Sequence, residues 1–155
     1  MRAMGIAIAI HTAVAVFLVG GLLFAQIILR PSLQSLDSSA RLTLWNEVLK
    51  RFLPRAWIGI VLLLATGLGM LHVTYGSMTL APPFVRGMLG LSVLLTAAFA
   101  YLQSVPWRRF RNAVASGDWS TAEQGAGRLR LALMIALLIG FLTVVIGAGG
   151  RYFPT

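Results

Sequence analysis

The chain has 155 residues, of which 58% are hydrophobic, 11% are charged and none is cysteine, and its formal net charge is +9. Soluble domains are about 45–50% apolar and about 25% charged, so this composition excludes an ordinary water-soluble fold. The lack of cysteine excludes disulfides and thiolate metal sites, and no nucleic-acid-binding motif accompanies the positive charge, which we therefore assign to anionic lipid headgroups.

Four apolar runs are long enough to cross a lipid bilayer, which needs about 20 residues. In chain order they are Met4–Leu29, Ala56–Tyr75, Phe84–Gln103 and Leu131–Ala148. The first is too long for the apolar core of a signal peptide, which is about 7–15 residues, so we expect it to be retained. The sequence predicts an all-α, integral membrane four-helix bundle that forms a single domain over residues 1–155.

The connections between these runs have their own patterns. Pro31 predicts the end of the first helix, because its ring disfavours helical continuation. Between residues 32 and 55, apolar residues recur at helical spacing among charged ones, which predicts a short interfacial amphipathic helix. Its apolar residues are Leu42, Trp45, Val48, Leu49, Phe52 and Leu53. We expect residues 107–130 to form a polar, basic loop that is partly helical.

The distribution of basic residues predicts the orientation of the chain in the membrane. The first and third connections share one side of a four-span bundle and hold Arg30, Arg41, Lys50, Arg51, Arg55, Arg108, Arg109, Arg111, Arg128 and Arg130. Only Arg2, Arg86 and Arg151 belong to the other side. The positive-inside rule places the richer side in the cytoplasm. We therefore expect a multi-pass protein of a bacterial inner membrane with both termini outside.

His11 and His72 are the only histidines, and each lies within an apolar run. Ionisable groups inside a span are costly and mark functional candidates, and antiparallel helices bring both towards the outer leaflet. Imidazole is a common axial ligand of haem iron, and Arg86 is placed to pair with a haem propionate. Our leading hypothesis is a haem b protein for electron transfer near the outer face, with His11 and His72 as metal ligands and a quinone or periplasmic protein as redox partner.

Other readings remain open. Imidazoles and methionine thioethers suit Cu(I), and Met4, Met70, Met78 and Met88 belong to the outer half without forming a compact motif, so copper import or handling is an alternative. A non-catalytic subunit of a larger membrane complex is another, because the connections are short. A homo-oligomer is a separate possibility for the partner of the chain. Each histidine is also explained by a hydrogen bond between helices. No catalytic motif decides whether the protein is an enzyme.

Short patterns along the chain carry a family resemblance. They are His11, Gly20-Gly21, Arg30-Pro31, Arg51-Phe52, Trp57, Ala65-Thr66-Gly67-Leu68 and Gly150-Arg151-Tyr152. In this combination the chain resembles the CopD-like (copper-resistance D) membrane domain, which is similar to membrane-type protoporphyrinogen oxidase. The resemblance implies a four-helix core, histidine chemistry in the outer leaflet at His11, and either copper handling or haem b. Oxidase-like relatives open the third helix with a histidine, which Phe84–Met88 lacks.

Overall fold

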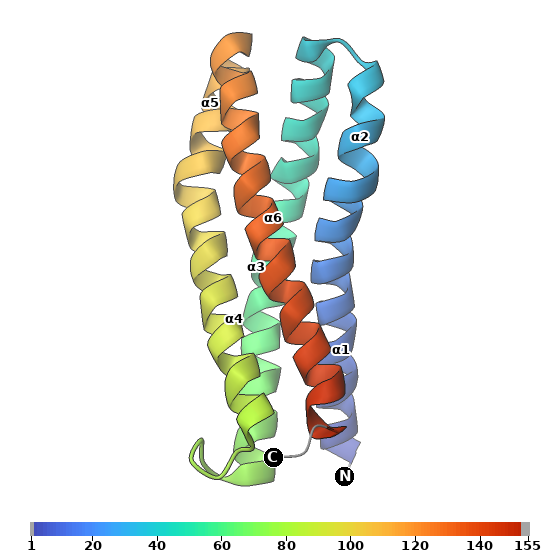
Figure 1. The fold of residues 1–155 in the computed structure, drawn as a ribbon, viewed down its shortest axis with the longest axis vertical. Coiled ribbons are helices and arrows are strands. Elements are labelled where there is room, and N and C mark those ends of the chain that lie inside the picture. Colours follow the sequence, from blue (N-terminus) through green and yellow to red (C-terminus); the bar gives the residue numbers. More distant parts are fainter. Residues whose placement is uncertain (1, 153–155) are drawn as a thin grey trace.

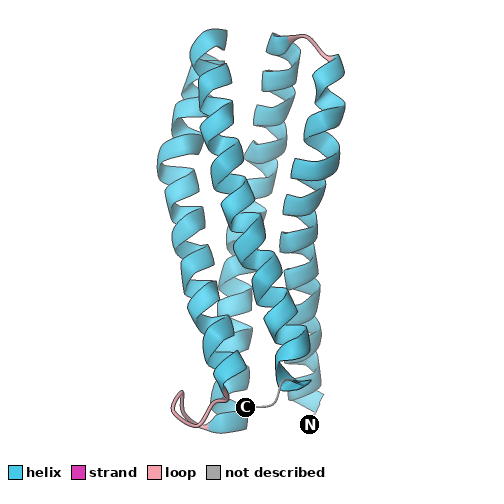
Figure 2. Ribbon diagram, in the orientation of Figure 1, coloured by secondary structure: helices cyan, strands magenta, loops and turns pink. Residues whose placement is uncertain are grey.

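The computed structural model describes residues 2–152, so Met1 and residues 153–155 of the predicted domain lie outside the described residues. Every regular element in the described part is helical, and the elements form four long helical segments side by side (Figure 1 and Figure 2). The first segment comprises α1 (Arg2–Leu23), a π-helical turn (Phe24–Leu29), α2 (Arg30–Ser32) and a 3-10 turn (Leu33–Ser35). The second is α3 (Ser38–Tyr75), and the third comprises α4 (Pro83–Leu102), a π-helical turn (Gln103–Trp107) and α5 (Arg108–Ala115). The fourth is α6 (Trp119–Gly149), followed by a 3-10 turn (Gly150–Tyr152).

The start of α1, the end of α6 and the loop between α3 and α4 lie at one end of the bundle, which we call the terminal end (Figure 1). The opposite end, the basic end, holds the tight turns before α3 and before α6. All 4 segments are long and apolar enough to cross a membrane, which confirms the predicted all-α four-helix bundle.

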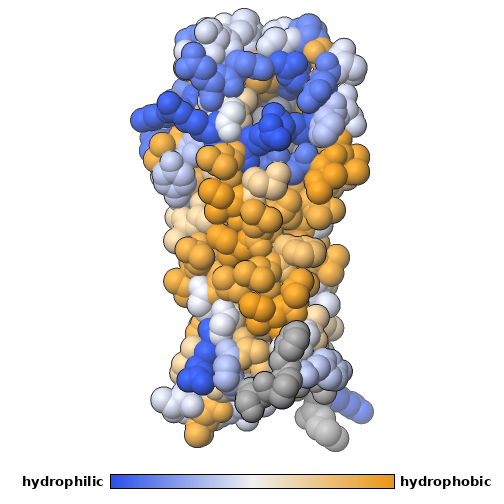
Figure 3. Space-filling model, viewed as in Figure 1, coloured by the Kyte–Doolittle hydropathy of each residue, from blue (hydrophilic) through white to orange (hydrophobic). Residues whose placement is uncertain are grey.

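Large apolar side chains cover the outside of the bundle between the two ends. Val16, Val61, Val93 and Leu138, one from each segment, are exposed by 67%, 60%, 60% and 62%. On the face that Figure 3 shows, hydrophobic residues form a belt across the middle of the molecule and hydrophilic residues gather mainly at the basic end. Such a surface is stable in lipid, where helices satisfy their own backbone hydrogen bonds. The chain is therefore a multi-pass membrane protein.

The segment predicted as a separate interfacial helix is helical and amphipathic, but it is continuous with the second span, because α3 runs unbroken from Ser38 to Tyr75. Its apolar side chains Leu42, Trp45, Leu49 and Leu53 are buried in the core of the bundle. Since these side chains pack against other helices, the segment does not turn aside to lie on the membrane. Residues 107–130 likewise form mostly α5 and α6, joined by a turn in which Gly117 has a φ of 70°.

The prediction that Pro31 ends the first helix is also wrong, because helical backbone continues to Ser35. A π-helical turn precedes the proline, and in it the Arg30 N–H bonds to the Ala25 carbonyl, five residues back. Pro106 lies inside the second π-helical turn. A proline removes one backbone donor and crowds the preceding turn, and a widened turn accommodates both effects.

The buried core occupies the basic half of the bundle. Its fully buried large side chains are Leu18, Leu22, Leu49, Leu53, Phe99, Leu102, Phe110, Leu129 and Leu133. In the described chain no residue of 2–17, 61–75, 83–94 or 141–149 is buried. The helices of the terminal half are therefore packed less tightly than those of the basic half, and this leaves room for a cavity.

Candidate functional site

A cavity of about 320 Å³ opens in the terminal half between α1, α3 and α4. Leucine side chains from α3 and α4 make much of its wall. Its chemically active lining is Met4 and His11 from α1, Met70 and Tyr75 from α3, and Met88 and Ser92 from α4. We call it the methionine cavity, because three of its helices each contribute one methionine.

His11 is held in the wall of the methionine cavity by α3. Its Nδ1 atom lies 2.8 Å from the Thr66 hydroxyl oxygen. That hydroxyl donates its hydrogen to the Leu62 carbonyl at 2.6 Å, one turn back on α3. A hydroxyl has one hydrogen, so towards His11 it accepts, and Nδ1 carries the imidazole proton. In the neutral imidazole this arrangement leaves Nε2 unprotonated, which is the form that coordinates metals.

Two glycines make room for the side chains of His11 and Met88. A Cβ atom on Gly67 would lie 3.3 Å from Cε1 of His11, so the imidazole rests on bare α3 backbone. A Cβ atom on Gly147 of α6 would lie 2.8 Å from Cε and 3.2 Å from Sδ of Met88. Ordinary contacts of this kind are about 3.5–4.0 Å. The observed positions of the His11 ring and the Met88 thioether therefore require glycine, which has no Cβ atom, at residues 67 and 147.

The donor set of the cavity is one imidazole and three thioethers, from Met4, Met70 and Met88. Thioether sulfur is a soft ligand that selects Cu(I), whereas Mg²⁺ and Ca²⁺ prefer carboxylates. Among the described residues, no three His, Asp or Glu side chains gather as a metal site. Met78, the fourth methionine considered from the sequence, is 38% exposed and does not line the cavity.

The other two sequence-predicted site residues lie elsewhere. His72 is exposed and does not line the methionine cavity. It follows Thr66 by six residues, which is about 9 Å along α3 and about 240° around it. Arg86 is also exposed and absent from the lining. The structure thus brings His11 together with three methionines, not with His72 or Arg86, and the haem roles of those two residues stay predictions.

The fold and this cavity define a small multi-pass membrane protein with a methionine-lined cavity near one end. The family described as CopD, Copper resistance protein D, matches residues 46–149, and the chain belongs to this family. The match confirms the resemblance and supports a copper-resistance or copper-handling membrane protein, whereas nothing in it supports haem b. No curated protein and no solved structure matches the chain. Met70 and Met88 lie within the matched residues, while Met4 and His11 precede them.

Proposed function

We propose that this protein binds Cu(I) in the methionine cavity and handles copper near the outer face of the membrane. The observation that carries the proposal is the meeting of His11, Met4, Met70 and Met88, from three helices, around one cavity. Their spacing in the sequence forms no copper motif, so the bundle creates the site. Copper is the cargo in this proposal, not a resident cofactor.

Neutral ligands suit a site that must release its ion. Three thioethers and one neutral imidazole add no negative charge to the cavity. Soft donors still select Cu(I) over the abundant hard cations. A site on a transport route has to bind well enough to fill and weakly enough to empty. A carboxylate cage would hold the ion by full charge attraction, which favours storage over transfer.

The distribution of charge supports an outward-facing cavity. The ten basic residues of the first and third connections belong to the basic end, opposite the methionine cavity. The positive-inside rule assigns the basic end to the cytoplasm, and therefore both termini and the cavity to the outer half of a bacterial inner membrane.

Haem b electron transfer has less support than copper. Two axial ligands must approach one iron from opposite faces of the macrocycle, yet His72 lies on a different face of α3 from the one that holds His11. The copper proposal requires neither a quinone nor a redox partner, and it is compatible with a homo-oligomer or a larger complex.

Competition for Cu(I) between the purified protein and the chromophore bicinchoninate, under reducing conditions, tests the proposal. We expect one Cu(I) per chain. His11→Ala and Met88→Leu should each weaken binding by about tenfold or more, because even outer partners of metal ligands change affinity by about 10–100-fold. Met→Leu conserves volume, so it separates loss of the sulfur from loss of packing.

Two matched controls come from the same chain. His72→Ala and Met78→Leu remove an imidazole and a thioether that do not line the methionine cavity, and both should bind Cu(I) as the parent protein does. Equal weakening by His11→Ala and His72→Ala would contradict the proposal. A colourless, copper-binding protein supports it, whereas a haem Soret band that disappears in the His11→Ala, His72→Ala double variant supports the haem hypothesis instead.

A further inference from the structure

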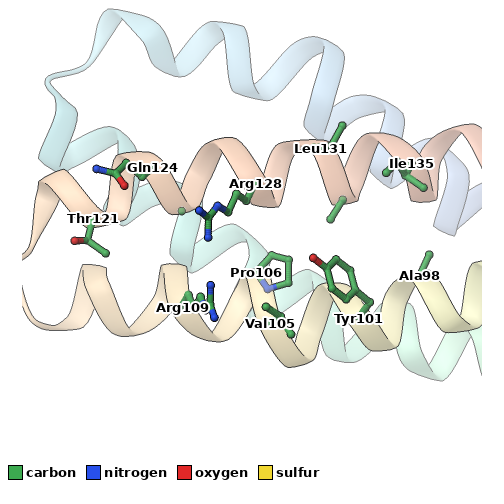
Figure 4. Close-up of a pocket in the computed structure, with 12 residues that line it drawn as sticks. Ala98, Tyr101, Val105, Pro106, Arg109, Thr121, Gln124, Arg128, Leu131 and Ile135 are labelled. Atoms are coloured by element: carbon green, nitrogen blue, oxygen red, sulfur yellow. The ribbon is translucent and has the colours of Figure 1, made fainter.

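A second hollow lies at the basic end and is chemically unlike the methionine cavity. It has a volume of about 550 Å³ and runs between α4 and α5 on one side and α6 on the other. We call it the arginine groove, because Arg109 of α5 and Arg128 of α6 line it. Figure 4 shows both guanidinium groups directed into the gap between the two helical segments, with Tyr101 further along the same gap.

The two arginines have no anionic partner within the described residues. The ion pairs found there are Arg41–Glu123 and Lys50–Glu47, and neither involves the arginine groove. The acidic side chains of the described chain are Asp37, Glu47, Asp118 and Glu123, and none of them lines it. Two like charges that face one gap repel each other unless an anion lies between them. The arginine groove therefore presents an uncompensated cationic site.

The remainder of the groove is apolar and enters the hydrophobic belt. Arg128, Leu131 and Ile135 follow one another on α6 over about 10 Å. Leu131 and Ile135 are 63% and 44% exposed, and Ala98 and Tyr101 face them from α4. One end of the groove is thus cationic and the other end is a shallow apolar channel. This order of charge and hydrophobic surface matches the order of headgroup and acyl chain in a phospholipid.

We infer that the arginine groove binds one anionic phospholipid of the leaflet at the basic end. The lipid phosphate lies between Arg109 and Arg128, since guanidinium groups bind phosphate oxygens in a directional, charge-assisted way. One acyl chain follows Ala98, Tyr101, Leu131 and Ile135 towards the middle of the membrane. The bound lipid joins the third helical segment to the fourth at the depth of the headgroups, independently of what the methionine cavity binds.

Native mass spectrometry of the full chain in detergent tests this inference. The protein is titrated separately with phosphatidylglycerol, with zwitterionic phosphatidylcholine of the same acyl chains, and with inorganic phosphate. We expect one phosphatidylglycerol to be retained in preference to phosphatidylcholine. The double variant Arg109→Gln, Arg128→Gln should weaken this binding by about 30-fold, which corresponds to about 1 kcal/mol for each arginine near a membrane surface.

The matched control is Arg51→Gln, Arg55→Gln, which removes the same charge from exposed side chains of α3 that do not line the groove. It should retain phosphatidylglycerol like the parent protein, and the melting temperature of both double variants should stay close to that of the parent. Equal loss in the control, or equal retention of phosphatidylcholine, would overturn the inference. Displacement of the lipid by millimolar inorganic phosphate would also overturn it, because the site would then recognise free phosphate instead of a lipid.

Discussion

Nδ1 of His11 lies 2.8 Å from the Thr66 hydroxyl oxygen, and this one contact joins α1 to α3 across the wall of the methionine cavity. The contact sets both the position and the tautomer of the imidazole, because the hydroxyl hydrogen is committed to the Leu62 carbonyl. It makes Thr66 a positioning residue, one step removed from the proposed ligands.

Thr66→Val should therefore weaken Cu(I) binding without touching a ligand. Valine has nearly the shape of threonine but no acceptor for Nδ1–H, so the imidazole loses its fixed orientation. We expect the affinity for Cu(I) to fall by about tenfold, which is at the lower end of the effects seen for outer partners of metal ligands. Thr66→Ser, which keeps the hydroxyl, should restore the affinity measured by bicinchoninate competition. Weak binding in the serine variant as well would show that the threonine acts through packing.

Gly147→Ala should lower the affinity for Cu(I) while leaving the stability of the fold nearly unchanged. The added Cβ would lie 2.8 Å from Cε of Met88, the flexible end of that side chain, so the methionine can move aside at little cost to the fold. Because Met88 lines the methionine cavity, displacing its thioether should lower Cu(I) affinity by about tenfold. Gly90→Ala on α4, which meets nothing within 4 Å, is the control for both affinity and melting temperature.

Gly150→Ala should instead lower stability. Gly150 is buried, and a Cβ there would lie 2.8 Å from Cγ of Phe84, next to the backbone of α4, where the neighbour cannot move away. Overpacking of this kind costs about 1–3 kcal/mol. Thermal unfolding in detergent should show a lower melting temperature than in Gly69→Ala, whose Cβ meets nothing within 4 Å. An unchanged melting temperature would mean that the terminal end tolerates separation of α6 from α4.

Acid should weaken the start of α6. Asp118 caps this helix by accepting the Thr121 N–H at 3.0 Å, and this backbone hydrogen bond lowers the pKa of the Asp118 carboxyl. A carboxyl whose pKa is lower in the folded state stabilises the fold above its unfolded pKa, about 3.9 for aspartate. That contribution is lost as the pH falls through the folded pKa.

The measurement is the melting temperature as a function of pH for the parent and for Asp118→Asn. Asparagine caps a helix as well but does not titrate. We expect the melting temperature of the parent to fall relative to that of the variant below about pH 4. Parallel curves for the two proteins at all pH values would contradict the assignment of this cap.

The sequence alone determined that the protein is an all-α membrane protein with four apolar spans. Apolar runs of about 20 residues leave only helices as a stable solution in lipid, because the backbone must satisfy its own hydrogen bonds there. The helix ends were less predictable. Pro31 predicted a helix break, which the π-helical turn before it avoids. The apolar stripe that contains Leu42 and Leu49 predicted a helix lying on the membrane surface, but these side chains are buried between helices.

The candidate site was also predictable from the sequence only in part. His11 was identifiable because an imidazole inside a span is costly, and Thr66 and Met70, four residues apart, share one helix face. Only the tertiary structure decided that Met88 joins them while His72 and Met78 do not. The physical reason is that an apolar helix in lipid shows little preference for which face it turns inward. The rotation of each helix is set by packing between helices, which no pattern within a single helix encodes.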